Sequence, residues 1–299
     1  MSTVARASPE ASRSTIILAL LAAYILGGSN YAAIDLALEG FGPFTMLALR
    51  FLFAGTVLYL LTKIWSEAGA RERGLWADAL LGLVLLGGTF GGIALAQTRL
   101  DSGLVAIVLA TAPVWAMAAG PLYGDWPMRR EWLGVALSLL GITALLDFDA
   151  APSDPLGVVF ALGAALSLAA GSAATRRMAP APPFRAAAIQ MLSAGTAFAV
   201  AAFLSGESGF LPLTPGPSMA LLHQSLMCSV VSFTAFVFLL SHTRNAVAMS
   251  FVYVNPIVAL ALGALLLDEG IGVNAVAATG MTLLGVGLII SKPEETNLE

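Results

Sequence analysis

Charged residues are scarce in this sequence. Lys, Arg, Asp and Glu make up 11% of the 299 residues, whereas 58% of the residues are hydrophobic. Soluble domains carry roughly 25% charged residues, so a soluble chain of this composition has too few polar groups to cover its surface. The scarcity of charge therefore excludes an ordinary soluble fold and predicts an integral membrane protein.

Disulfides, buried glutamates and catalytic motifs are also missing. The single cysteine, Cys228, excludes an intrachain disulfide. No glutamate lies in the centre of an apolar segment, which argues against a small proton-coupled pump for cationic drugs. There is no HExxH motif and no cysteine–histidine spacing typical of a metal site. We therefore expect no catalytic residues, no metal and no cofactor.

Long apolar runs, in contrast, fill the chain. Each is close to the ~20 residues that a helix needs to cross the hydrocarbon core of a membrane. None alternates with the period of two that is typical of a barrel strand, so we expect an all-α integral membrane protein. Short connections rich in proline and glycine separate ten segments: 15–37, 43–62, 76–97, 103–123, 131–147, 156–175, 184–205, 218–240, 245–267 and 272–291.

Basic residues indicate how these helices are oriented. If the N-terminus is cytoplasmic and the loops alternate, the outer loops hold only Arg99, and Arg50 lies inside a helix. Cytoplasmic loops of membrane proteins are enriched in Lys and Arg, so both termini are expected in the cytoplasm. The inner segments hold the other twelve basic residues: Arg6, Arg13, Lys63, Arg71, Arg73, Arg129, Arg130, Arg176, Arg177, Arg185, Arg244 and Lys292.

An internal repeat relates the two halves of the chain. The run ATAPVWAMAAGPLYGDW, residues 110–126, matches YVNPIVALALGALLLDE, residues 253–269, with Pro113 aligned to Pro256. A repeat with an odd number of spans must insert its second copy upside down, and inverted repeats are typical of secondary transporters. The sequence thus predicts ten transmembrane helices as two inverted five-helix repeats, divided as 1–14 (cytoplasmic tail), 15–150 (first repeat), 151–291 (second repeat) and 292–299 (cytoplasmic tail).

The paired prolines suggest where a binding site lies. A proline inside a helix removes a backbone hydrogen bond, and in lipid the freed carbonyl needs a partner or a wet cavity. Pro113 and Pro256 are therefore predicted helix breaks or hinges that face a central cavity, although a packing kink without a substrate role is the alternative. Polar and aromatic residues at membrane depth are the candidate substrate-binding residues: Asn30, Thr111, Trp115, Ser229, Ser232, Phe233, Tyr253 and Asn255.

Two charged residues lie inside predicted helices near their outer ends. Arg50 lies about seven residues into its helix, roughly 10 Å deep at 1.5 Å per residue. Asp35 lies near the outer end of the first helix, so the two residues are a candidate outer ion pair. If they pair, the central cavity holds no ionised side chain, and a zwitterionic substrate is bound by amides and carbonyls alone.

The whole chain resembles a known family. The runs GGSNYAA (27–33), LRFLFAG (49–55), ATAPVWAMAAGPLYGD (110–125) and VNPIVALALGALLLDEGI (254–271) are similar to those of the drug/metabolite transporter superfamily, in its ten-helix members with two EamA-type domains. Two departures are Leu26-Gly27-Gly28, where the family often has Trp-Gly before the Ser-Asn of the first helix, and Asp125, where it commonly has Glu. Within the superfamily the chain is most similar to bacterial exporters of amino acids, including aromatic ones.

The resemblance implies a transporter of the bacterial inner membrane rather than an enzyme. We expect it to export small metabolites, most of all amino acids with apolar or aromatic side chains, by alternating access. A multidrug or other metabolite carrier, a channel-like facilitator and a membrane scaffold are the alternatives. The expected partners are a small-molecule substrate and membrane lipid, with no nucleic acid, and the expected assembly is a monomer or a weak homodimer.

Overall fold

The fold is entirely helical in the part of the chain that the computed structural model describes. That part comprises residues 12–64, 74–100, 102–123, 126–145, 154–178, 182–207, 214–267 and 273–291. Six helical stretches of the described part are long and apolar enough to cross a membrane, two of them (75–97 and 215–242) with a π-helical segment inside, and further apolar helices are shorter. The prediction of an all-α integral membrane protein is therefore confirmed.

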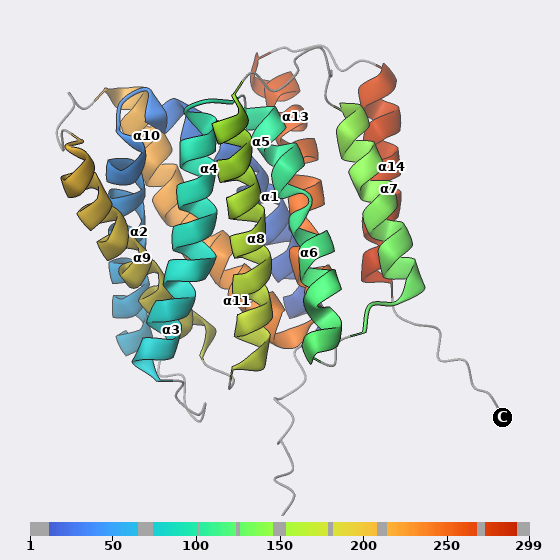
Figure 1. Ribbon diagram of the computed structural model, residues 1–299, viewed down its shortest axis with the longest axis horizontal. Helices are drawn as coiled ribbons and strands as arrows, with labels where there is room; N and C mark the ends of the chain where they lie inside the picture. The colour runs from blue at the N-terminus through green and yellow to red at the C-terminus, as the bar shows by residue number, and fades with distance from the viewer. Residues whose placement is uncertain are drawn as a thin grey trace, which may run out of the picture.

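Ten membrane spans follow one another along the described part of the chain (Figure 1). Six are uninterrupted α-helices: α1 (Arg13–Leu38), α2 (Pro43–Ile64), α7 (Arg129–Leu145), α8 (Pro155–Arg177), α9 (Pro183–Ser205) and α14 (Val273–Ile290). The other four spans are composite. The third consists of α3 (Leu75–Gly82), η1 (Leu83–Gly88) and α4 (Thr89–Gln97), and the fourth consists of α5 (Ser102–Leu109), α6 (Ala112–Ala119) and η2 (Gly120–Tyr123). The eighth consists of α10 (Pro215–His223), η3 (Gln224–Phe233) and α11 (Thr234–His242), and the ninth consists of α12 (Asn245–Met249) and α13 (Phe251–Leu267).

The two five-helix repeats pack against each other in matching pairs. The second spans of the two repeats, α2 and α9, are in contact, as are the fifth, α7 and α14. The first span of each repeat packs against the third span of the other, α1 against η3 and α8 against α4. In Figure 1, α1 and α8 run in opposite directions, as an inverted repeat requires.

Equivalent spans are also interrupted in equivalent ways. The third and eighth spans each contain a π-helical segment, η1 and η3. The fourth span breaks between Leu109 and Ala112, and the ninth breaks at Ser250. Such departures from α-geometry inside membrane helices are often found at functional sites, and here both repeats carry them.

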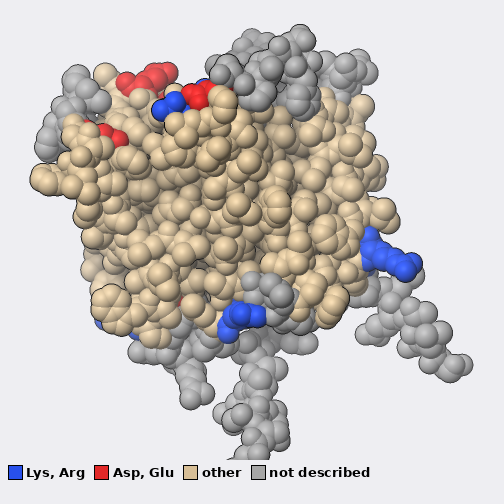
Figure 2. Space-filling model, in the orientation of Figure 1, with Lys and Arg blue, Asp and Glu red and all other residues tan. Residues whose placement is uncertain are grey.

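The two ends of the bundle differ in charge. Acidic side chains gather at the upper end in Figure 2, and basic side chains are seen along the lower end. At the upper end Glu207 accepts hydrogen bonds from the backbone N–H groups of Phe44 and Thr45 at 3.1 and 2.7 Å, which caps α2. There too the Arg99 guanidinium, 2.8 Å from Asp154, lowers the pKa of that carboxyl. At the lower end Glu131 accepts from Arg244 at 2.7 Å.

Candidate functional site

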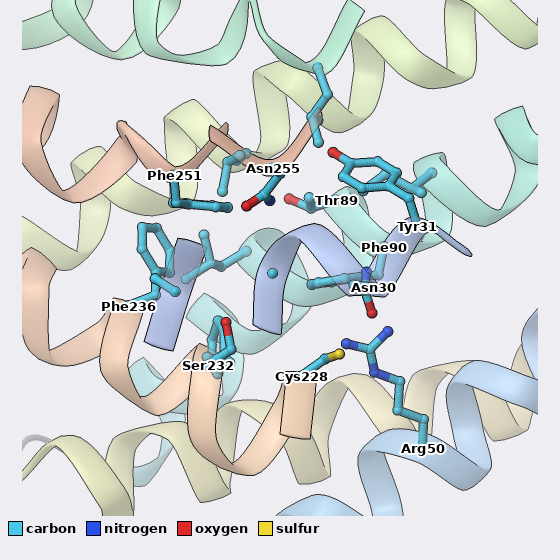
Figure 3. A pocket seen from close by; sticks show the side chains of 17 residues that line it. Asn30, Tyr31, Arg50, Thr89, Phe90, Cys228, Ser232, Phe236, Phe251 and Asn255 are labelled. Carbon is cyan, nitrogen blue, oxygen red and sulfur yellow. The ribbon is translucent and has the colours of Figure 1, made fainter. Parts of the chain in front are cut away.

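A cavity lies at the centre of the bundle (Figure 3). It has a volume of about 70 Å³, room for several water molecules, and is lined from α1, α2, η1, α4, α5, α8, η3, α11 and α13. Both repeats contribute to its wall. The lining is aromatic at Tyr31, Phe90, Phe233, Phe236 and Phe251, and polar at Asn30, Arg50, Thr89, Cys228, Ser232 and Asn255.

Four of the predicted substrate-binding residues line this cavity: Asn30, Ser232, Phe233 and Asn255. The carboxamide oxygens of Asn30 and Asn255 are buried, and no hydrogen-bond partner for either lies in the described part of the chain. A buried amide oxygen without a partner loses its interaction with water and gains nothing in return. Both amides are therefore available to a ligand in the cavity.

The other four predicted residues do not line the cavity. Thr111 donates to the carbonyl of Val108 at 2.7 Å and accepts from Trp115 Nε1 at 3.2 Å, and Trp115 is 44% exposed at the bundle surface. Tyr253 is fully buried and is not among the residues that line the cavity. Ser229 is fully buried outside the cavity lining, and its hydroxyl accepts a hydrogen bond from Arg50 Nε.

The predicted position of the helix breaks needs correction. Pro256 lies inside the continuous helix α13, and the ninth span breaks six residues earlier, at Ser250. The Ser250 hydroxyl donates to Val247 O at 2.7 Å and is 2.7 Å from the Tyr24 hydroxyl, so side-chain hydrogen bonds stabilise this break. In the fourth span the break precedes Pro113, which lies in the first turn of α6, where its missing N–H costs little.

Two glycines position Asn255 against α1. A Cβ atom built on Gly28 lies 2.5 Å from Val258 Cβ and 2.9 Å from the backbone oxygen of Asn255. A Cβ atom on Gly27 lies 3.0 Å from Asn255 Oδ1. Because the contact at Gly28 leaves no room for a side chain and the one at Gly27 is tight, these glycines allow α13 to approach α1 closely. The close approach brings Asn30 of α1 and Asn255 of α13 to one cavity.

The predicted ion pair between Asp35 and Arg50 is wrong. Asp35 Oδ1 accepts from Gln97 Nε2 at 2.7 Å. Arg50 is only 1% exposed, and its hydrogen-bond partners in the described part of the chain are neutral: Ser229 Oγ at 2.8 Å from Nε and Gln224 Oε1 at 3.1 Å from Nη1. Arg50 borders the cavity, so the expectation of a cavity without an ionised side chain is wrong as well.

Sequence reasoning therefore missed the groups around Arg50. Gln224 donates from Nε2 to the carbonyl of Ala33 at 2.7 Å, which leaves Oε1 directed at the guanidinium. The rings of Phe51 and Phe90 cover Arg50, with centroids 4.9 and 4.6 Å from Cζ. An arginine at membrane depth was a signal for these contacts, because such a charge requires several polar or aromatic neighbours.

Comparisons with known proteins agree with this architecture. The profile of the EamA-like transporter family matches residues 13–146 and 155–291. The "Uncharacterized inner membrane transporter YedA" of Escherichia coli (strain K12) is 32% identical over 91% of this chain and 89% of its own. "Protein PecM" of Dickeya dadantii (strain 3937) is 26% identical over 88% of this chain and 86% of its own.

A solved crystal structure shares the fold. It aligns with a TM-score of 0.80 over 93% of this chain and 97% of its own, at 19% sequence identity. At that identity the likeness concerns the fold alone.

Proposed function

Because this chain belongs to the EamA-like transporter family, we propose that it exports apolar and aromatic amino acids across the bacterial inner membrane by alternating access. The observation that carries the proposal is the central cavity, where aromatic side chains surround the amides of Asn30 and Asn255. Substrate sites of inverted-repeat transporters lie between the two halves, as this cavity does.

Alternating access is supported by the size and the walls of the cavity. Its volume of about 70 Å³ is well below the 300–1,000 Å³ typical of sites for drug-sized ligands. An aromatic amino acid therefore requires the surrounding helices to separate. The breaks at Thr111 and Ser250, and the π-helical segments η1 and η3, lie in four of the spans involved and are places where such a movement is least opposed.

Counterflow with purified protein in liposomes tests the proposal. We expect Phe, Trp, Met and Leu to be exchanged, and Asp and Lys to stay near background, because beyond Arg50 the described wall holds no charged partner for an extra side-chain charge. Asn255→Ala should weaken all good substrates together, by roughly 10-fold, because it removes one hydrogen bond to the part they share.

The matched control is Trp115→Ala. Trp115 is 44% exposed and outside the cavity, so its truncation should leave counterflow unchanged. Strong exchange of Lys or of a cationic dye, with Phe at background, would replace amino acid export by the drug-efflux alternative. Flux that does not saturate would favour a channel-like facilitator.

We also propose that both termini face the cytoplasm. The twelve-to-one distribution of basic residues in the sequence supports this orientation. In a Cys228→Ser background, Thr98→Cys at the upper end should react with an impermeant thiol reagent on intact cells, whereas Ser291→Cys at the lower end should not. Both positions are exposed. Labelling of position 291 and protection of position 98 would reverse the orientation.

A further inference from the structure

Arg50 presents an incomplete hydrogen-bonding shell to the cavity. A guanidinium has five N–H donors. In the described part of the chain, Ser229 Oγ and Gln224 Oε1 accept from two of them, one on Nε and one on Nη1. Three N–H groups, both of those on Nη2 among them, thus have no acceptor among the described residues, although the side chain is only 1% exposed and lines the cavity.

The charge of Arg50 is not neutralised either. The cavity wall contains Arg50 and no carboxylate among the residues described. Phe51 and Phe90 stabilise the cation through their ring faces, and Gln224 and Ser229 supply partial negative charge, but none of them carries a formal charge. A buried guanidinium without a counter-ion is costly at membrane depth, so an anion that reaches the cavity gains a charge-assisted, bidentate partner.

The neighbouring groups define the rest of the ligand. Figure 3 shows the guanidinium of Arg50 directed toward Asn30, with the ring of Phe90 beside them. Phe236 and Phe251, whose ring centroids are 5.1 Å apart, line another part of the same cavity. The combination is one cation, two amides and an aromatic wall, and it contains no acid to pair with an ammonium group.

We infer that Arg50 binds the carboxylate of the transported substrate, and that the substrate class is monocarboxylates with an apolar or aromatic body, with or without an amino group. The inference rests on the proposed function, because it assigns a partner to one end of the proposed amino acid substrate. It also extends that function, since a carboxylate is required for binding and an ammonium is not.

Three ligands that share a phenyl ring separate the contributions of the two charges. Purified protein in detergent is equilibrated with radiolabelled L-phenylalanine, and unlabelled phenylalanine, phenylpropionate or phenylethylamine is added as competitor. We expect phenylpropionate to compete within about 10-fold of phenylalanine, and phenylethylamine, which lacks the carboxylate, to compete at least about 10-fold more weakly. Direct binding of radiolabelled phenylpropionate is measured in parallel.

Substitution of Arg50 tests the residue itself. Arg50→Gln removes the charge without stranding an opposite one, because its partners Ser229 and Gln224 are neutral. It should weaken phenylalanine and phenylpropionate at least about 10-fold, and Arg50→Lys, which keeps the charge but not the planar fork, should lie between it and the wild type. Arg99→Gln, the same substitution at an exposed arginine, is the matched control and should bind like the wild type. If Arg50→Gln does not fold, the three wild-type competitions decide alone.

The possible failures are distinguishable. The carboxylate site is overturned if phenylethylamine competes as well as phenylalanine, or if a folded Arg50→Gln variant binds with unchanged affinity. In either case, counterflow of phenylalanine still upholds amino acid export. If phenylalanine shows no counterflow but phenylpropionate binds in a way that depends on Arg50, amino acid export is overturned and the carboxylate site is upheld.

Discussion

Arg244→Gln is expected to lower the free energy of unfolding by about 3–5 kcal/mol, because it leaves a buried carboxylate without its cation. Arg244 Nε and Nη2 donate to Glu131 Oε1 and Oε2 at 2.7 and 3.1 Å, a bidentate pair that joins the start of α7 to the start of α12. Glu131 is only 1% exposed, whereas Arg244 is 39% exposed. Removing the arginine therefore strands the buried partner.

Substitution of the acidic partner instead should lower the free energy of unfolding by less. Glu131→Gln leaves the arginine, which water still reaches, so a loss of roughly 1.5–3 kcal/mol is expected from its charged hydrogen bonds. The double variant should recover most of the loss caused by Arg244→Gln. Unfolding in mixed micelles titrated with SDS measures all three. An equal cost for both single variants would contradict this account.

The surface pair of Arg99 and Asp154 is the control for this experiment. Its side chains are 41% and 29% exposed, and its nitrogen–oxygen distance is 2.8 Å. Exposed ion pairs contribute about 0–1 kcal/mol even at good geometry. Arg99→Gln should therefore leave the unfolding curve nearly unchanged, and a cost similar to that of Arg244→Gln would mean that burial does not decide these energies.

Gly28→Ala is expected to abolish most transport and to destabilise the bundle by about 1–3 kcal/mol. The added methyl group lies 2.5 Å from Val258 Cβ and 2.9 Å from Asn255 O, so α1 and α13 must move apart. That movement displaces Asn255 from the cavity it lines. Initial rates of phenylalanine counterflow and SDS titration measure the two effects.

Gly163→Ala adds the same methyl group where it meets nothing. Apart from the neighbouring backbone of α8 itself, no atom lies within 4 Å of a Cβ built on Gly163. Alanine is a better helix former than glycine by about 0.5–1 kcal/mol, so this variant should be as stable as the wild type or more stable, with normal transport. Normal transport by Gly28→Ala would show that the close approach of α1 and α13 does not position the site.

The arrangement around Arg50 has a wider consequence for the transporter. A cation in a shared central cavity favours substrates that bring an anionic group, and the neutral aromatic wall then accepts a range of apolar bodies. Apolar contact discriminates one methylene by only about 1–3 kcal/mol, so a family of related carboxylates is expected rather than one substrate. The proposed selectivity thus comes from a carboxylate at one end of the ligand and from an uncharged apolar body at the other end.

The position of Arg50 illustrates why side-chain contacts were harder to predict than the fold. Arg50 and Asp35 lie at similar depths in neighbouring spans, which is all that hydropathy and spacing reveal. Whether they meet depends on the rotation of α2 about its axis, and that rotation is decided by packing against α9 and η3. The observed rotation directs Arg50 to Gln224 and Ser229.

Helix interruptions are a second case. The paired prolines marked the correct two spans, but the ninth span breaks at Ser250, where Tyr24 of α1 meets the serine hydroxyl. The π-helical segment η3 also changes which side chains of the eighth span share a face, so a periodicity of 3.6 residues misplaces the residues that follow it. Both features depend on contacts with other spans.

By itself the sequence determined the membrane class, the ten spans and the inverted repeat. These follow from local properties, because apolar length, charge scarcity and repeated motifs are written along the chain. Of the eight residues it proposed for substrate binding, Asn30, Ser232, Phe233 and Asn255 line the cavity and the other four do not. Only the tertiary structure decided that Arg50 faces the cavity and that Trp115 faces outward. Helix rotation and helix breaks result from contacts between distant segments, and a lipid environment gives apolar faces too little contrast for a single sequence to specify them.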